Sequence, residues 1–326
     1  MKITMAHGSG GRATSELIRD VFAKYFGNEV LNAMEDAAVV PGAGTIAVTT
    51  DSFVVDPLFF QGGDIGRLSI CGTVNDLAMN GARPKYLTCG FILEEGLDIA
   101  LLDRIALSMK NTAEEAGVMI VAGDTKVIGG NGGLYINTAG IGFVPAGRRV
   151  SPRLCEAGDV LLVSGTMGDH HAAILSARMA IQNTIESDLA PLNRMATALL
   201  DAGVAVKAMR DVTRGGLATI LNEFAAASGC GIEINEQDVP VAEQVAAFCG
   251  ILGLDPLYMG NEGKMVLAVS EKDADRALEI LKTHAYGRDA AVIGSVTNGK
   301  GVALRTRLGG RRHLDVLYGE GLPRIC

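Results

Sequence analysis

A segment rich in proline, glycine and arginine, residues 145–152, divides this chain into two halves, each of which alternates strand-like and helix-like patterns. Such a segment is typical of a linker between domains. At 326 residues the chain also exceeds the length at which one hydrophobic core usually keeps growing. We therefore predict two domains of a mixed α/β or α+β class, residues 1–148 and 149–318, followed by a tail of residues 319–326.

Strand and helix signals in the first half stop at small or acidic residues. The helical spacing of Leu68, Cys71 and Val74 predicts a helix that Asp64 caps and Gly81 ends. In this half we also expect strands at 45–50, 85–93, 118–122 and 134–144 and a helix at 98–116. In the second half we expect strands at 159–164, 264–269 and 290–296 and helices near 171–182, 191–202, 213–228 and 273–283.

Composition argues against several classes of function. The chain has 29 basic and 37 acidic residues, a net charge of −8, and no run of Lys or Arg, so we expect no nucleic-acid partner. The longest uncharged stretch, residues 127–147, is interrupted by glycine, asparagine and proline, so we expect neither a membrane span nor a signal peptide. The six cysteines lie far apart without a Cys-x-x-Cys pair, which favours a reducing cytoplasm and no structural zinc.

Four aspartates of the first half stand beside small residues that leave room for a ligand. They are Asp36, Asp51, Asp76 and Asp124, of which Asp51 and Asp124 should follow strand ends. Carboxylates gathered in this way suit Mg²⁺, which usually arrives with the phosphates of a nucleotide. Any one of them alone would more often cap a helix or a turn. The four together predict a site for ATP and Mg²⁺.

Glycine-rich turns offer a second kind of phosphate contact. His7-Gly-Ser-Gly-Gly11 and Gly215-Gly216 are able to present backbone N–H groups to phosphates, while Lys126 or Arg214 neutralises charge. A single glycine pair is more often only a turn. None of these segments is a Walker A sequence, so a P-loop enzyme is not expected.

Two further residues are candidates for chemistry. Glu262 lies in Asn261-Glu-Gly-Lys264, just before a predicted strand, and offers a base, although a solvated turn residue is the commoner interpretation. The chain ends in Gly319-Glu-Gly-Leu-Pro-Arg-Ile-Cys326, a tail suited to carry a thiol into another site, with a frayed terminus as the alternative. Cys326 is the last residue and not the fourth from last, so the tail is not a prenylation signal.

Taken together, these segments resemble the HypE family of hydrogenase maturation factors over nearly the whole chain. The segments that carry the resemblance are residues 7–11, 50–60, 71–76, 91–96, 123–126, 211–216, 261–264 and 323–326. Residues 35–39, Glu-Asp-Ala-Ala-Val, also resemble an acidic signature of a wider superfamily. That superfamily contains aminoimidazole ribonucleotide synthetase, selenophosphate synthetase and thiamine-monophosphate kinase.

The resemblance implies a two-domain α+β fold like that of aminoimidazole ribonucleotide synthetase. It implies that the N-terminal domain pairs with that of a second subunit in a barrel-like homodimer, with ATP and Mg²⁺ sites close to the interface. It implies that Asp36, Asp51, Asp76 and Asp124 hold the metal. The nucleotide contacts that it implies are His7, Gly8, Ser9, Gly10, Gly11, Asp51, Asn75, Asp76, Gly123, Asp124, Thr213, Arg214 and Gly215.

The resemblance also implies a reaction. A carbamoyltransferase, HypF, would load a carbamoyl group onto the sulfur of Cys326, and ATP would then drive dehydration of the thiocarboxamide to a thiocyanate. The cyano group would pass to iron in the HypC–HypD complex, for the active site of [NiFe] hydrogenase. Phosphorylating the amide oxygen first makes it a better leaving group than hydroxide. Lys126 would stabilise the developing phosphate, and Glu262, with Lys126 as the competing assignment, would take protons from the amide nitrogen.

Other functions remain open at this stage. A catalytically silent carrier would only present Cys326 to its partners. Another ATP-dependent enzyme of the same superfamily is a further alternative. A selenophosphate synthetase would be expected to carry Cys or selenocysteine near residues 7–11, which have none. A thiamine-phosphate kinase or an aminoimidazole ribonucleotide synthetase would not need a terminal cysteine.

Overall fold

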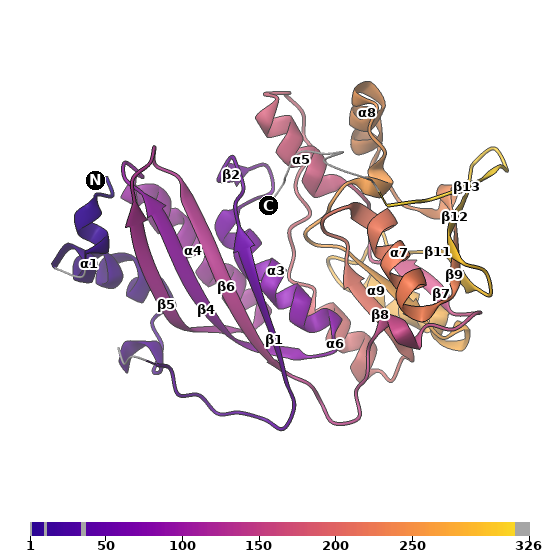
Figure 1. Ribbon diagram of the computed structural model, residues 1–326, viewed down its shortest axis with the longest axis horizontal. Helices are drawn as coiled ribbons and strands as arrows, with labels where there is room; N and C mark the ends of the chain where they lie inside the picture. The colour runs from indigo at the N-terminus through magenta and orange to yellow at the C-terminus, as the bar shows by residue number, and fades with distance from the viewer. Residues whose placement is uncertain (1, 10–11, 34–36, 317–326) are drawn as a thin grey trace.

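The computed structural model describes residues 2–9, 12–33 and 37–316. Figure 1 shows two sheets side by side, one from each half of the chain, with helix α3 (Ile65–Met79) between them. The short strands β2 (Phe59–Phe60) and β3 (Gly63–Asp64) pair as a hairpin before α3. Residues 144–151, most of the predicted linker, connect the last strand of the first sheet to the second half.

The first sheet has four strands in the order β1-β6-β4-β5. They are β1 (Ile46–Phe53), β4 (Arg83–Glu94), β5 (Met119–Ile128) and β6 (Leu134–Phe143). All neighbours are antiparallel except β4 and β5, which are parallel. Helices α3 and α4 (Ile99–Ala116) lie on one face of this sheet (Figure 1). Helices on one face of a mostly antiparallel sheet confirm the predicted α+β class.

Short helical segments precede the first sheet and pack near the outer edge formed by β5. They are η1 (Met5–Gly8), α1 (Arg12–Leu17), η2 (Ile18–Phe22), α2 (Ala23–Phe26) and η3 (Leu31–Ala33). The sequence analysis did not predict them.

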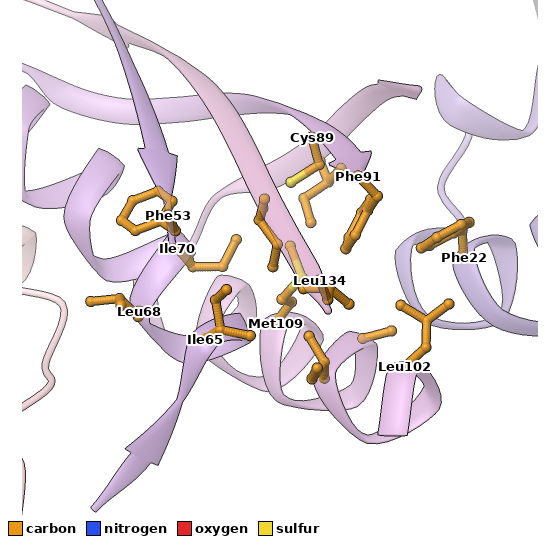
Figure 2. Packing of buried hydrophobic residues seen from close by; sticks show 14 of the residues in the cluster. Phe22, Phe53, Ile65, Leu68, Ile70, Cys89, Phe91, Leu102, Met109 and Leu134 are labelled. Atoms are coloured by element: carbon orange, nitrogen blue, oxygen red, sulfur yellow. The ribbon is translucent and has the colours of Figure 1, made fainter. Parts of the chain in front are cut away.

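Helix α3 forms where the sequence predicted it, and it is buried on nearly every side. Asp64 caps its N-terminus, because the carboxylate accepts hydrogen bonds from the N–H groups of Gly66 at 2.7 Å and Arg67 at 3.1 Å. A helix with apolar side chains on every side must be packed against other parts of the protein on every side. The first sheet covers one side of α3 and the second half of the chain covers the other. Figure 2 shows part of the core, which includes Phe53, Ile70, Phe91 and Met109.

Two strands run further than the sequence predicted. Asp51 and Asp124 were expected just after strands, but β1 continues to Phe53 and β5 to Ile128. Both acids therefore lie within strands. The reason is tertiary: β6 pairs with β1 along its whole length, and β4 pairs with β5 as far as Ile128. Ladder hydrogen bonds thus extend each strand past the glycines and acids at which propensity alone would end it.

The second sheet has seven strands in the order β13-β12-β9-β11-β7-β10-β8. Its strands are β7 (Val160–Val163), β8 (Val206–Asp211), β9 (Gly231–Asn235), β10 (Met265–Val269), β11 (Ala291–Thr297), β12 (Gly301–Arg305) and β13 (Arg311–His313). Its helices are α5 (Asp169–Arg178), α6 (Asn193–Asp201), α7 (Gly216–Ser228), α8 (Glu243–Leu252) and α9 (Ala274–Thr283). Single turns lie at η4 (Pro152–Leu154), η5 (Glu236–Asp238), η6 (Pro256–Tyr258) and η7 (Glu271–Asp273).

The predicted strands and helices of this half are confirmed, but five elements were missed. The missed elements are β8, β9, α8, β12 and β13. The four strands have three to six residues each, and β8, β12 and β13 contain basic residues. A run so short carries little periodic signal. Their strand character comes instead from pairing: β8 lies beside β10, while β9 lies between β11 and β12.

Two polar clusters hold the halves together. Asp201 of α6 accepts hydrogen bonds from Arg83 of β4, at 2.9 and 3.0 Å, and from Arg148 at 2.6 Å. On the other side, Arg67 of α3 donates to Glu115 at 2.9 Å and to Tyr286 at 3.2 Å. Each cluster joins one residue or more from each half of the chain.

Candidate functional site

A cavity of about 570 Å³ lies between the two halves. The first half supplies β1 and α3 to its wall, and the second half supplies β8, the turn after β8, α7 and the loop before β10. The charged residues that line it are Asp51, Asp76, Arg210, Asp211, Arg214, Glu223 and Glu262. Five of the expected site residues, Asp51, Asp76, Thr213, Arg214 and Glu262, thus meet at one place.

The packing of α3 on β1 positions the first two carboxylates. Thr73 of α3 donates a hydrogen bond to Asp51 Oδ2 at 3.2 Å, and Thr49 of β1 donates to Asp76 Oδ2 at 2.7 Å. Each acid is thus held by a threonine from the opposite element. Because alternate residues of a strand share a face, Thr49 and Asp51 both point toward α3.

The cavity concentrates negative charge that the protein does not fully neutralise. Burial, and then the charge of Asp76, raise the pKa of Asp51 to about 6. The same two causes raise the pKa of Asp211 to about 7. Burial, followed by the charges of Asp211 and other acids, raises the pKa of Glu262 well above its ordinary value. The guanidinium of Arg214 opposes the shifts of Asp51 and Glu262, so the cavity favours a bound cation.

The residues fit a magnesium ion that arrives with phosphates. Among residues 2–9, 12–33 and 37–316, no group of three or more His, Cys, Asp or Glu side chains is close enough to hold a metal directly. Mg²⁺ is usually bound by one or two carboxylates, several waters and the phosphates of the substrate. Asp51 and Asp76 can supply such carboxylates. The other expected ligand from this region, Asp36, lies outside the described residues.

Glu262 is buried, not solvated, and only 4% of its surface is exposed. Its backbone N–H donates to Asp188 Oδ1 at 3.1 Å, and its carbonyl oxygen accepts from Asn75 Nδ2 at 3.4 Å. Lys264 Nζ lies 3.8 Å from Asp188 Oδ2. The turn that the sequence predicted is therefore fixed inside the molecule, at the edge of the cavity.

Sequence reasoning missed Asp211 and Asp188 as members of this acidic cluster. Asp211 is the last residue of β8, a strand that was not predicted, so its position at a strand end went unnoticed. Asp188 lies in a segment without helix or strand between α5 and α6, where no periodic pattern marks a buried residue. An acidic residue at the end of a strand was the one sequence signal that could have identified Asp211 as a site residue.

Most of the remaining described candidates form a second group at β5. Gly8 of η1 packs so close to β5 that a β-carbon there would lie 2.8 Å from the backbone nitrogen of Val127. His7 is hydrogen-bonded to Thr4, and Lys126 forms an ion pair with Asp124 at 2.8 Å. Ser9 and Gly123 belong to the same region. This second group does not line the cavity.

A single chain does not bring Asp124 to Asp51, because the two acids lie at opposite edges of the sheet. Three strand spacings separate β1 from β5, or about 14 Å. The register places Asp51 in one row with Thr138, Cys89 and Gly123. Asp124 stands in the next row and thus leaves the sheet from the face opposite to α3.

The other expected residues divide between a turn, a buried contact and undescribed segments. Gly215, at φ 79°, allows the tight turn between β8 and α7, where a β-carbon would lie 2.2 Å from Thr219 Oγ1. Asn75 is 1% exposed and bonds only to backbone groups. Gly10, Gly11 and Cys326 lie outside the described residues.

Four of the five described cysteines are buried: Cys71, Cys89, Cys155 and Cys249. Burial raises the pKa of Cys89 and Cys155 to about 12 and that of Cys249 to about 11, and it also raises the pKa of Cys71. Such thiols are poor nucleophiles, because the thiolate is the reactive form. Along the described ranges, no helix is both long and apolar enough to cross a membrane.

Comparisons with known proteins identify the family of this chain. Two family models match: the N-terminal domain of AIR synthase related proteins at residues 34–144, and their C-terminal domain at residues 156–307. Carbamoyl dehydratase HypE from Escherichia coli (strain K12) is 48% identical over 334 residues, covering 99% of each chain. The crystal structure of hydrogenase maturation protein HypE in complex with ATP has 46% identity and a TM-score of 0.95, over 99% of each chain. In a HypE–HypF complex, the matching chain has 49% identity and a TM-score of 0.82, over 92% of this chain and 99% of that one.

Proposed function

This chain belongs to the HypE carbamoyl dehydratase family, and we propose that it uses ATP to dehydrate a carbamoyl group carried on the sulfur of Cys326. The product is a thiocyanate, which supplies the cyano ligand for the iron of [NiFe] hydrogenase. The observation that carries the proposal is the cavity between the two halves, where buried acids face Arg210 and Arg214. Relatives that match along the whole chain are named carbamoyl dehydratase, and one was crystallised with ATP.

The two walls of the cavity suit phosphoryl transfer to an amide oxygen. Asp51 and Asp76 would hold Mg²⁺, with Asp36 as a further ligand. When it is bound together with ATP, the ion neutralises negative charge on the phosphates. Arg214, from the turn before α7, faces the same space and would contact the phosphates together with Thr213. Fixed charges of this kind stabilise a transferring phosphoryl group without reorganising during the reaction.

Glu262 is the proposed base for the protons of the amide nitrogen. It lines the cavity and is nearly excluded from water, and its pKa is raised, so it accepts a proton more readily than an exposed glutamate. Lys126 remains the competing assignment, because it belongs to the family motif at residues 123–126.

Cys326 is the proposed carrier, and its partners follow from that role. HypF would load the carbamoyl group, in line with the relative crystallised with HypF. The HypC–HypD complex would receive the cyano group. We place the reaction in the cytoplasm, where the five described free cysteines stay reduced. A covalent carrier keeps the reactive group at a high effective concentration while it moves between sites.

Mass measurement of the C-terminal peptide tests the function. The purified chain is incubated with HypF, carbamoyl phosphate, ATP and Mg²⁺, and the peptide is weighed before and after a further addition of ATP and Mg²⁺. We expect a gain of one carbamoyl group on Cys326, followed by ATP-dependent loss of one water. Cys326→Ala should abolish the gain, whereas Cys230→Ala, at a partly exposed cysteine, should not. Carbamoylation without dehydration would instead identify a silent carrier.

We also propose a homodimer in which the first sheets of two copies close into a barrel. The face of this sheet opposite to α3 exposes the apolar side chains of Ile46, Val48, Ile92 and Ile128. In the described part of the chain, β1 and β5 each have a neighbour on one side only. Long unpaired edges and an apolar face favour association with a second sheet.

The proposed pairing places β5 of one chain beside β1 of the other at each junction, as a two-fold axis along the barrel requires. The cavity at Asp51 of one chain then lies beside strand β5 of the partner, the strand that carries the partner's Asp124 and the partner's Lys126. The two groups of candidate residues, which lie apart within one chain, would thereby contribute to one site.

A further inference from the structure

Asn75 ties the two halves of the chain together beside the cavity. It precedes Asp76 on α3 and is 1% exposed. Its amide nitrogen donates to the carbonyl oxygens of Ala190 at 3.1 Å and Glu262 at 3.4 Å. Its Oδ1 accepts from the N–H of Leu192 at 2.7 Å. An asparagine amide has two N–H donors, and the protein backbone uses both, so neither remains for a nucleotide.

The loop that carries Glu262 is held from its other side as well. Asp188 Oδ1 accepts the N–H of Glu262 at 3.1 Å, and the side chain of Asp188 is 3% exposed. Gly263 lies so close to Asp188 that a β-carbon would be 1.8 Å from its carbonyl oxygen. The backbone N–H of Glu262 is thus fixed by Asp188 and its carbonyl by Asn75.

We propose that Asn75 is a positioning residue that sets Glu262 of one half of the chain against Asp76 of the other. This inference rests on the proposed function, in which Asp76 holds the metal and Glu262 takes the proton. Asn75 touches neither reacting group with its own side chain and acts through the backbone of Glu262. A misplacement of about 1 Å in such a site can lower a rate about 100-fold, because proton transfer depends steeply on distance.

The proposal separates the chemical step from nucleotide binding. Asn75→Ala should lower the single-turnover rate of dehydration at least about tenfold, measured on carbamoylated chain at saturating ATP and Mg²⁺. The dissociation constant of ATP, measured by calorimetry with Mg²⁺ present, should stay within about twofold, because Asn75 has no free donor for the nucleotide. A residue that merely stabilised the fold would change both quantities or neither.

Asn193→Ala is the matched control. Asn193 of α6 is also a buried asparagine that joins the two halves, and it donates to the carbonyl oxygen of Ala116 at 2.8 Å. It does not line the cavity. We expect a comparable fall in melting temperature for both variants, with the dehydration rate preserved only in Asn193→Ala.

A second pair of variants covers the case in which Asn75→Ala does not fold. Asp188→Asn keeps an oxygen that accepts the N–H of Glu262, whereas Asp188→Ala removes it. Dehydration should therefore be largely retained in the first and lost in the second, with ATP affinity unchanged in both. If Asp188→Ala dehydrates at the normal rate, the loop does not need this positioning.

Three results would overturn the inference: a tenfold weaker affinity for ATP in Asn75→Ala, a normal dehydration rate in that variant, or an equal rate loss in Asn193→Ala. The first would make Asn75 a nucleotide ligand after all. Wild-type chain is measured in parallel, so failure of the function itself is recognised separately, as absence of water loss in the wild type. In that case the ATP affinity of Asn75→Ala still decides whether Asn75 is a ligand.

Discussion

The two outer strands of the first sheet each carry an aspartate, and the pKa values of these two aspartates are shifted in opposite directions. Asp51 of β1 is partly buried, and burial with the nearby charge of Asp76 raises its pKa to about 6. Asp124 of β5 has 69% of its side chain exposed, and its hydrogen bond from Lys126 lowers its pKa. Both residues come from segments that look alike in the sequence, an acid after a β-rich run. Their environments differ because Asp51 points toward α3 and the cavity, whereas Asp124 points outward from the opposite, open face of the sheet.

The difference shows that Asp51 lies in a cavity formed within one chain, whereas Asp124 does not. At β1 the carboxylates already sit in a cavity with arginines opposite. At β5, Asp124 and Lys126 form an ion pair that is exposed to solvent, and such an exposed pair contributes little to the stability of the fold. We propose that this exposed edge contacts β1 of a second copy.

The largest expected effect comes from mixing two inactive variants. Asp51→Asn and Lys126→Ala should each be inactive in dehydration when pure. In a mixture that forms hybrid dimers, one site carries both changes and the other carries neither. About a quarter of the wild-type activity should return, since half of the dimers are hybrids with one intact site. If each chain forms its site alone, every site stays damaged and no activity returns.

A charge on the open sheet face should disrupt the dimer and the activity together. Val48 is 71% exposed, and Val48→Asp places a carboxylate in the proposed interface without touching the cavity. We expect a monomer by light scattering and at least a tenfold loss of dehydration, because burying an unpaired charge is costly. Ile251→Asp, at an isoleucine 84% exposed on α8, is the control that should keep both. An active monomer would show that β1 needs no partner.

The raised pKa values of Asp51 and Asp211, about 6 and about 7, predict a pH-dependent response to Mg²⁺ and ATP. The folded chain binds more protons at these groups than the unfolded chain between about pH 4 and 7. Their contribution to the free energy of unfolding therefore falls as pH rises through that window. A cation favours the ionised form, so Mg²⁺ with ATP should raise the Tm by several degrees more at pH 8 than at pH 5.5. In Asp51→Asn this difference should shrink; an unchanged difference would place the titration elsewhere.

The smallest expected effect concerns stability at β5. Asp124→Asn removes the ion pair with Lys126, and we expect the free energy of unfolding to change by less than about 0.5 kcal/mol. Urea denaturation measures this directly. The same variant should be impaired in dehydration if the partner's site uses Asp124. A large loss of stability would instead mean that Asp124 has a structural role within its own chain.

How far the sequence predicts the molecule depends on whether a feature is local. Helix α3, its cap at Asp64 and the long helix α4 follow from periodicity and capping, and the structure confirms them. The position of Glu262 does not follow, because burial of its loop depends on Asp188 and Asn75, which are distant in the chain. The separation of Asp124 from Asp51 likewise depends on strand order, which no local pattern encodes.

The two polar clusters that join the halves have a consequence for motion. Asp201 binds Arg83 and Arg148 at one end of the interface, while Arg67 binds Glu115 and Tyr286 elsewhere along it. Ties at two separate places resist both hinge bending and sliding of one half over the other. We therefore expect the two halves to move as one rigid body. A nucleotide would then enter a cleft that is already formed, without a closing motion of the halves.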